Sequence, residues 1–255
     1  MITREDLRQY SSIFSNNPSP KMSDKYTMLN SMNVINKLEE YGYYPSKINE
    51  SKVRKSENQG YQAHTIRFRH ENFKNLSLYD NCPELVYINS HNGRISAKMF
   101  AGIFRMVCSN GQVIADSELG GIVHKHMGLD SEGLEEVIYN FAKQTDKILT
   151  HVDDYKKIKL NETEKKDFAT IAKNEIYGKK SKINPIQLVT PRRETDFYED
   201  LFTVYNVVQE NVTKGGIEYK TDKKRVKTKE IKSPQRDLDI NVFLWGLMDQ
   251  FAKLK

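Results

Sequence analysis

Residues 61–70, which read YQAHTIRFRH, indicate the fold most directly. Their alternation predicts a strand with one apolar face, carrying Ile66 and Phe68, and one polar face, carrying Arg67 and Arg69. Antiparallel sheets often bury one face and expose the other, so the arginine face is expected to contact water.

Strands and turn signals surround this stretch. Residues 85–89 form a short apolar strand, and residues 94–107 are extended throughout or with one helical turn near Lys98. The pairs Asn92-Gly93 and Asn110-Gly111 predict tight hairpins, because a type I′ turn needs positive φ at both central residues.

Helical spacing of apolar residues dominates the rest of the chain. Helices are expected at 31–41, 134–149, 161–177, 197–212 and 239–253, with 197–212 the clearest amphipathic one. The order of a helix, a run of strands and a run of helices predicts an α+β fold. Its parts are an N-terminal helix, a central antiparallel sheet with tight Asn-Gly hairpins, and C-terminal helices.

Two parts of the chain are expected to differ in organisation. Residues 1–30, polar with scattered apolar anchors, predict an N-terminal arm, and residues 31–255 a single α+β domain. That domain would comprise a strand-rich region (43–126) and a helix-rich region (131–255) that includes a basic loop (214–236).

Composition excludes some classes of protein. The chain has 255 residues, of which 38% are hydrophobic, too many for a disordered chain. No apolar run approaches membrane-spanning length, and the start, MITREDLRQY, has no apolar signal region. Cys82 and Cys108 lack zinc-site spacing. We therefore expect a cytoplasmic protein.

The net charge of +6 is concentrated in the basic loop. Against three acids, this loop carries nine cations, which account for the whole excess: Lys214, Lys220, Lys223, Lys224, Arg225, Lys227, Lys229, Lys232 and Arg236. Lysines on a loop suit phosphate contact, although the same charges would serve a merely solvated loop.

A second candidate surface lies on the predicted sheet. Arg67 and Arg69 share one strand face, and Arg94 and Lys98 would share another if their segment is extended. Such a face could follow single-stranded nucleic acid. An ordinary charged sheet face is the alternative.

Motifs for catalysis, cofactors and metals are absent from the sequence. There is no P-loop, G-x-G-x-x-G, H-E-x-x-H or G-x-S-x-G pattern. His91, His124 and His126 lack a further ligand at defined spacing, so no metal and no cofactor is expected.

Several strings in order resemble domain-of-unknown-function family 932. They are YSSIFSNN (10–17), SDKY (23–26), HTIRFRH (64–70), PELVYINSHNGRIS (83–96), GIFRMVCSNG (102–111), RRETDFYEDLFTVYNVVQENVTKGG (192–216) and DINVFLWGLMDQF (239–251). The resemblance covers nearly the whole chain. It implies an origin in phages, prophages or plasmids and a bacterial cytoplasm, but no activity.

Polar residues in these strings predict a structural hub, in which the turns and a polar helix stripe bond one another. Its members would be Asn89, His91, Asn92, Arg105, Asn110, Gln209 and Asn211.

We therefore expect a non-enzymatic DNA-binding protein that acts on single-stranded or recombining DNA, as an annealing factor does. Its contacts would come from Arg67, Arg69, Arg94, Lys98 and the basic loop. The alternative is an anti-defence or regulatory protein whose basic loop binds a host protein.

Overall fold

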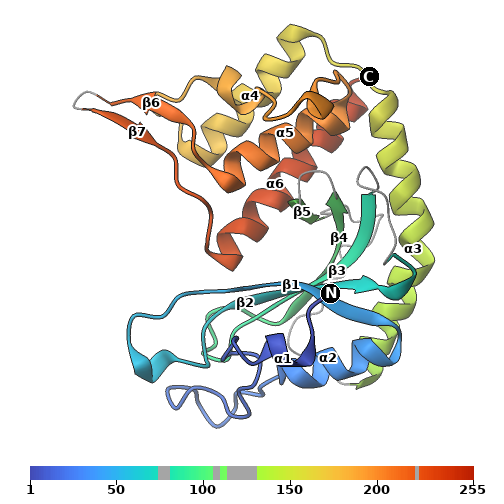
Figure 1. The fold of residues 1–255 in the computed structure, drawn as a ribbon, viewed down its shortest axis with the longest axis vertical. Coiled ribbons are helices and arrows are strands. Elements are labelled where there is room, and N and C mark those ends of the chain that lie inside the picture. Colours follow the sequence, from blue (N-terminus) through green and yellow to red (C-terminus); the bar gives the residue numbers. More distant parts are fainter. Residues whose placement is uncertain (74–80, 106–109, 114–130, 222–223) are drawn as a thin grey trace. The chain divides into compact units, whose positions relative to one another are not determined.

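The computed structural model describes residues 1–73, 81–105, 110–113, 131–221 and 224–255 (Figure 1). They form two compact units. Unit 1 holds Met1–Asp146 and Lys232–Gln235, and unit 2 holds Lys147–Ile231 and Arg236–Lys255.

Unit 1 is built on a five-stranded antiparallel sheet in the order β1-β2-β3-β4-β5 (Figure 1). The strands are β1 (Tyr43–Glu50), β2 (His64–His70), β3 (Asn81–Asn89), β4 (Lys98–Arg105) and β5 (Asn110–Val113). Each strand pairs with the one before it in sequence. With helices following the sheet, this architecture confirms the predicted α+β class.

The apolar face of β2 continues across its neighbour. Ile66 lies opposite Tyr87, and Phe68 opposite Leu85. All four side chains are buried. The alternation in HTIRFRH therefore identified this core face correctly.

The other face of β2 differs from the prediction. Arg67 is only 5% exposed, its cross-strand neighbour Val86 is buried, and every residue from Cys82 to Asn89 in β3 is buried. The expected water-exposed arginine face is therefore wrong. The period of two separates the two faces of a strand but does not say whether both are covered.

The two Asn-Gly pairs have different surroundings. Asn92-Gly93 lies in the connection between β3 and β4, where Gly93 has a φ of +69°. Asn110 and Gly111, in contrast, belong to β5 and pair with Arg105 and Phe104. The turn predicted at Asn110-Gly111 is therefore wrong, because both residues are paired within strand β5.

The N-terminal arm is packed on the rest of unit 1. It contains the short helix α1 (Arg4–Leu7). Leu7 and Ile13 are buried, and the Ser19 amide donates to the carbonyl of His91 at 2.8 Å. Apolar anchors and backbone bonds thus both hold it.

Helix α2 (Ser31–Glu40) confirms the helix predicted at 31–41. The side chain of Asn30 accepts a hydrogen bond from the Asn33 amide at 3.1 Å and caps its first turn. Ile35 and Leu38 are buried on one face. The chain leaves the helix at Gly42, whose φ is +78°.

Helices make up most of unit 2. They are α4 (Glu162–Tyr177), α5 (Leu201–Lys214), α6 (Pro234–Lys253) and the last part of α3 (Ser131–Lys157), joined by the 3-10 turns η4 (Pro185–Leu188) and η5 (Glu194–Asp196). All four long helices were predicted, with ends shifted by several residues. None of the described helices is long and apolar enough to cross a membrane.

Helix α5 lies at the centre of unit 2 rather than at its surface. Every residue from Leu201 to Val212 is buried, so the predicted amphipathic pattern is wrong for its polar side. These polar groups are satisfied internally: Asn206 donates to the carbonyl of Phe202 at 2.6 Å, and Gln209 to Asn241 of α6 at 3.1 Å.

Candidate nucleic-acid interface

The basic loop folds as a two-stranded hairpin. Strand β6 (Glu218–Lys220) pairs with β7 (Arg225–Lys227) in antiparallel register. In Figure 1 the hairpin extends away from helices α4 and α5 of the same unit. Short strands that carry charged residues are typical of exposed sheet edges.

Two glycines and a set of backbone bonds hold the base of the hairpin. Gly215 follows α5 with a φ of +66°, and Gly216 has a φ of +86°. A Cβ on Gly215 would lie 2.6 Å from the carbonyl carbon of Lys229, so a larger residue does not fit. The Gly216 amide donates to the carbonyl of Thr228, and the Thr228 amide to that of Ile217, each at 2.9 Å.

The register sorts the hairpin into two faces. Tyr219 lies opposite Val226, and both are half-buried. On the other face Lys220 lies opposite Arg225, and both are exposed. The apolar pair thus occupies one side of the ribbon and the cations the other.

One pair on the charged face is neutralised. Lys227 Nζ lies 2.8 Å from Glu218 Oε1, a bond that raises the pKa of Lys227 and lowers that of Glu218. The other exposed cations of the hairpin have no ion pair with any part of the chain that the structure describes: Lys220, Lys224, Arg225 and Lys229. These four are available to an external anion.

The end of α4 meets the base of the hairpin. Gln187 in η4 donates to the carbonyl of Glu218 at 2.9 Å. Burial raises the pKa of Tyr177, the last residue of α4, while its neighbours Thr228 and Arg236 lower it. Tyr177 therefore packs beside the chain that leaves β7.

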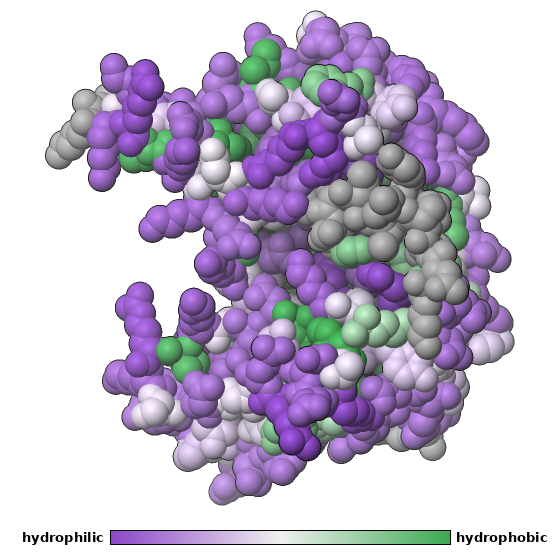
Figure 2. All heavy atoms as spheres, in the orientation of Figure 1, coloured by the Kyte–Doolittle hydropathy of each residue, from purple (hydrophilic) through white to green (hydrophobic). Residues whose placement is uncertain are grey.

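This contact adds two cations that the sequence interpretation missed. Lys179 and Lys180 are exposed and follow Tyr177 by two and three residues, which keeps them within roughly 11 Å of it along the chain. The signal was present as GKKSK at 178–182. We call the combined set the basic hairpin surface: Lys179, Lys180, Lys220, Lys224, Arg225, Lys227 and Lys229. Figure 2 shows that hydrophilic residues cover most of the hairpin.

The other predicted contacts are not among the residues that define this surface. Lys223 falls outside the described residues. Lys232 already has an interaction partner and, with Arg94 and Lys98, belongs to unit 1. Arg94 is exposed but precedes β4, so it does not share a strand face with Lys98.

Arg67 and Arg69 are internal ion-pair partners. Arg67 lies 3.3 Å and Arg69 2.9 Å from different oxygens of the fully buried Glu84. Ser46 also donates to Glu84 at 3.0 Å, and Arg67 to the carbonyl of Gln112 at 3.2 Å. Arg67 is therefore not an exposed cation as expected, because a buried carboxylate requires the arginines as countercharges.

The predicted hub is divided between the two units. In unit 1, Asn89 donates to the carbonyl of Leu29 at 3.1 Å, and His91 Nε2 lies 2.9 Å from the carbonyl oxygen of Ser12. Asn92 accepts from the Arg94 amide within its own turn. These residues hold the N-terminal arm and the β3–β4 connection.

In unit 2, Asn211 serves a different segment. Its amide donates to the carbonyls of Leu188 and Thr190 at 2.9 and 3.0 Å, and its oxygen accepts from Arg192 at 2.7 Å. Within its own unit, Asn211 therefore fixes the segment around η4 to helix α5. Arg105 ends β4, and the side chain of Asn110 is outside the described set.

A serine and two histidines form a buried cluster in unit 1. Ser31 Oγ lies 2.8 Å from His64 Nε2 and 3.5 Å from His91 Nε2. All three residues are fully buried, so a substrate has no access to them. Desolvation lowers the pKa of His64 to about 3 and also lowers that of His91, which favours neutral rings.

The described part of the chain has no group of three or more His, Cys, Asp or Glu side chains that could hold a metal ion. His124 and His126 lie outside that part.

Two proteins of Escherichia coli (strain K12) are similar to this chain. They are the UPF0380 proteins YafZ and YfjQ, each 28% identical over 251 residues, which cover 97% of this chain and 90% of the relative. No solved structure matches the chain. The family described as Domain of unknown function (DUF932) matches residues 20–241, and the chain belongs to this family.

Proposed function

We propose that this chain is a DNA-binding protein that contacts the phosphate backbone through the basic hairpin surface. The observation that carries the proposal is the group of exposed cations on the β6–β7 hairpin, Lys220, Lys224, Arg225 and Lys229, which form no ion pair within the described residues. Seven cations belong to this surface. Among the described residues between positions 218 and 230, only Glu218 and Glu230 are acidic. Phosphate contacts of this kind give affinity without sequence specificity.

The geometry of the hairpin suits two forms of DNA. A two-stranded ribbon is narrow enough to enter the major groove of a duplex. Flexible lysines can equally follow a single strand. We propose single-stranded or recombining DNA as the substrate because the family resemblance implies a mobile-element origin. No covalent step is part of the proposal.

The test is fluorescence anisotropy with labelled single-stranded DNA, duplex DNA and RNA across a salt series. The variant carries Lys220→Gln, Lys224→Gln, Arg225→Gln and Lys229→Gln. Its matched control removes four exposed cations of unit 1: Lys25→Gln, Lys52→Gln, Arg54→Gln and Lys55→Gln. Both variants lose the same net charge.

We expect the hairpin variant to bind DNA at least about tenfold more weakly than the control at moderate salt. Its salt slope on single strands should fall by up to about 3, since each lost contact removes about 0.7. Equal losses in both variants would mean that only net charge matters. Unchanged binding in the hairpin variant would refute the proposal.

The alternative is that an acidic protein, rather than DNA, binds these cations. A pull-down from nuclease-treated host lysate, with the hairpin variant as control, separates the two. A complex that survives nuclease and requires the hairpin lysines would favour the protein partner.

A further inference from the structure

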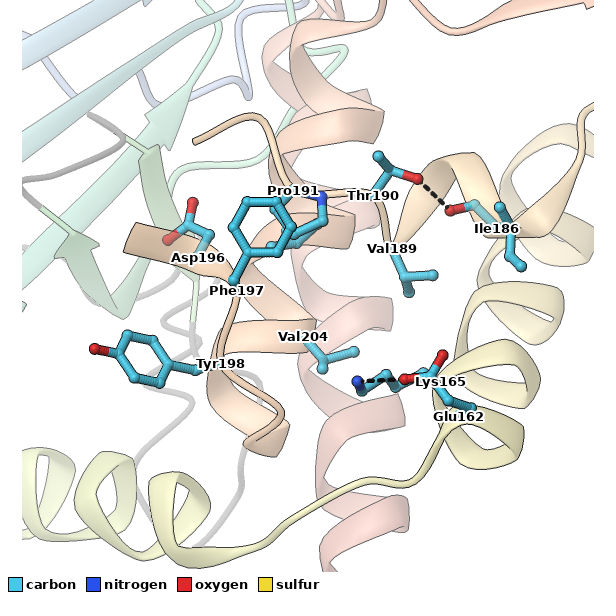
Figure 3. Close-up of a pocket in the computed structure, with 11 residues that line it drawn as sticks. Glu162, Lys165, Ile186, Val189, Thr190, Pro191, Asp196, Phe197, Tyr198 and Val204 are labelled. Atoms are coloured by element: carbon cyan, nitrogen blue, oxygen red, sulfur yellow. Dashed lines mark hydrogen bonds and ion pairs between the residues drawn. The ribbon is translucent and has the colours of Figure 1, made fainter. Parts of the chain in front are cut away.

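A second surface of unit 2 is apolar and concave. It is a pocket of about 270 Å³ between α4, η4, η5 and α5 (Figure 3). Val189, Pro191, Val204 and Val207 supply its apolar lining.

Large hydrophobic side chains beside this pocket are exposed to water. Phe197 is 69%, Tyr198 65% and Ile186 53% exposed. Figure 3 shows the two aromatic residues on one side of the pocket and Ile186 on the other. Exposed apolar groups that gather around a concave surface mark an interaction site more often than isolated ones do.

The segment that carries Phe197 and Tyr198 is held at both ends. On one side the Phe197 amide donates to the carbonyl of Glu194 at 3.2 Å. On the other, the Leu160 amide donates to the carbonyl of Glu199 at 2.9 Å, and Asp200 caps α5 through the Thr203 amide at 2.8 Å. The backbone that carries the aromatic pair is therefore fixed, which lowers the entropic cost of binding.

The charges next to the pocket are acidic on balance. The ammonium of Lys165 lies 2.8 Å from Glu162 and 3.1 Å from Glu199, so one cation serves two carboxylates. The Lys165 side chain is only 16% exposed, whereas those of Glu162 and Glu199 are 86% and 62% exposed. A ligand thus meets carboxylates first. Phosphates would be repelled, and cationic groups attracted.

We propose that this pocket binds a protein segment in which an apolar side chain is flanked by lysine or arginine. The apolar side chain enters between Ile186 and the Phe197-Tyr198 pair. The flanking cations meet Glu162 and Glu199. This site is distinct from the basic hairpin surface and does not depend on DNA binding, so the protein would carry two interfaces of opposite charge.

The probe is the synthetic peptide Lys-Lys-Leu-Phe-Lys-Lys with blocked ends, titrated into the full chain with ¹³C-labelled isoleucine and valine methyl groups. We expect saturable shifts at Ile186, Val204 and Val207. Substituting Phe197→Ala with Tyr198→Ser should weaken binding at least tenfold. The matched control is Tyr139→Ala, which removes another exposed aromatic side chain, 58% exposed on α3.

Charge is tested separately. The variant Glu162→Gln with Glu199→Gln should weaken binding of the basic peptide several-fold, and a peptide with glutamates in place of the lysines should not bind. Equal binding of the acidic peptide would overturn the proposal. Displacement of the peptide from these methyl groups by oligothymidine would also overturn the proposal. The same holds if a second copy of the chain is found to bind at these methyl groups.

Loss of the fold should not explain a loss of binding in these variants. Phe197, Tyr198, Glu162 and Glu199 are exposed, so their variants should unfold at the wild-type temperature. A folded Phe197→Ala with Tyr198→Ser variant that keeps full peptide affinity would refute the site.

Discussion

Gly111 of β5 lies directly against the guanidinium of Arg67 in β2. A Cβ at Gly111 would stand 2.3 Å from Arg67 Cζ and 2.5 Å from its Nε. Arg67 cannot move away freely, because Glu84 and the carbonyl of Gln112 hold it. The absence of a side chain at position 111 is thus what gives the buried arginine its space.

Gly111→Ala should therefore destabilise the protein. The added methyl group must displace a bonded guanidinium in a packed interior, which costs on the order of 1–3 kcal/mol. The measurement is the free energy of unfolding in urea. The control is Gly246→Ala in α6, where a Cβ would meet nothing within 4 Å and where alanine favours the helix. A loss no larger than in the control would contradict the close approach.

Glu84→Gln should cost more than an exposed substitution of the same kind. Glu84 is fully buried and faces Arg67 and Arg69, so the amide would leave two cations without their carboxylate. Breaking a buried pair costs on the order of 3–5 kcal/mol. The control, Glu57→Gln, breaks the exposed pair with Lys21 and should cost less than about 1 kcal/mol. Similar unfolding free energies for the two variants would argue against the network.

This network also explains why the sequence was misleading about β2. The alternation correctly placed Ile66 and Phe68 on one face and Arg67 and Arg69 on the other. The arginines, however, led to the prediction that their face contacts water. The carboxylate that neutralises the arginines lies on the neighbouring strand, at Glu84, and cross-strand register is not readable from one strand. Residue type therefore predicted the faces, while the exposure of the second face depended on tertiary pairing.

Other features also separate into those that local sequence determines and those that depend on tertiary contacts. The capping residues of α2 and α4, Asn30 and Asn161, act within three residues of the chain, so local sequence predicts their helices well. Helix α5 was recognisable as a helix, but the burial of Gln209 and Asn211 depends on Asn241 and on η4. That Lys179 and Lys180 lie within chain reach of the hairpin base likewise depends on Tyr177, which packs beside Thr228.

Stability should fall on mild acidification because of the buried histidines. Desolvation, with a smaller effect from His91, lowers the pKa of His64 to about 3 in the folded state, and burial lowers that of His91. In the unfolded chain both titrate near 6.5. Above pH 6.5 neither state binds the protons. Below it the unfolded state gains them first, and each histidine reduces stability by up to about 1.4 kcal/mol per pH unit.

The measurement is the free energy of unfolding in urea between pH 7.5 and 4.5. Wild-type protein should lose stability over this interval, and His64→Gln with His91→Gln should show a flatter profile. Carboxylates contribute the same background to both proteins. Parallel profiles would show that the ring contacts with Ser31 and Ser12 do not require neutral histidines.

The two glycines at the base of the hairpin separate backbone strain from steric fit. Both have positive φ, so alanine is strained at either position, and at Gly215 a ψ of −151° adds to this, because that combination of angles is essentially restricted to glycine and costs other residues on the order of 1–3 kcal/mol. At Gly215 a Cβ would also lie 2.6 Å from the Lys229 carbonyl carbon, whereas at Gly216 nothing lies within 4 Å. Gly215→Ala should therefore displace the chain that leaves β7, and Gly216→Ala should leave the hairpin paired.

Amide hydrogen exchange of Thr228, whose amide bonds to the carbonyl of Ile217, reports this directly. Exchange should accelerate markedly in Gly215→Ala and only slightly in Gly216→Ala. If the basic hairpin surface binds DNA as proposed, Gly215→Ala should also weaken binding although it removes no charge, because the cations of β7 would no longer be aligned with those of β6. Equal exchange rates in the two variants would mean that strain, and not the contact with Lys229, governs the base of the hairpin.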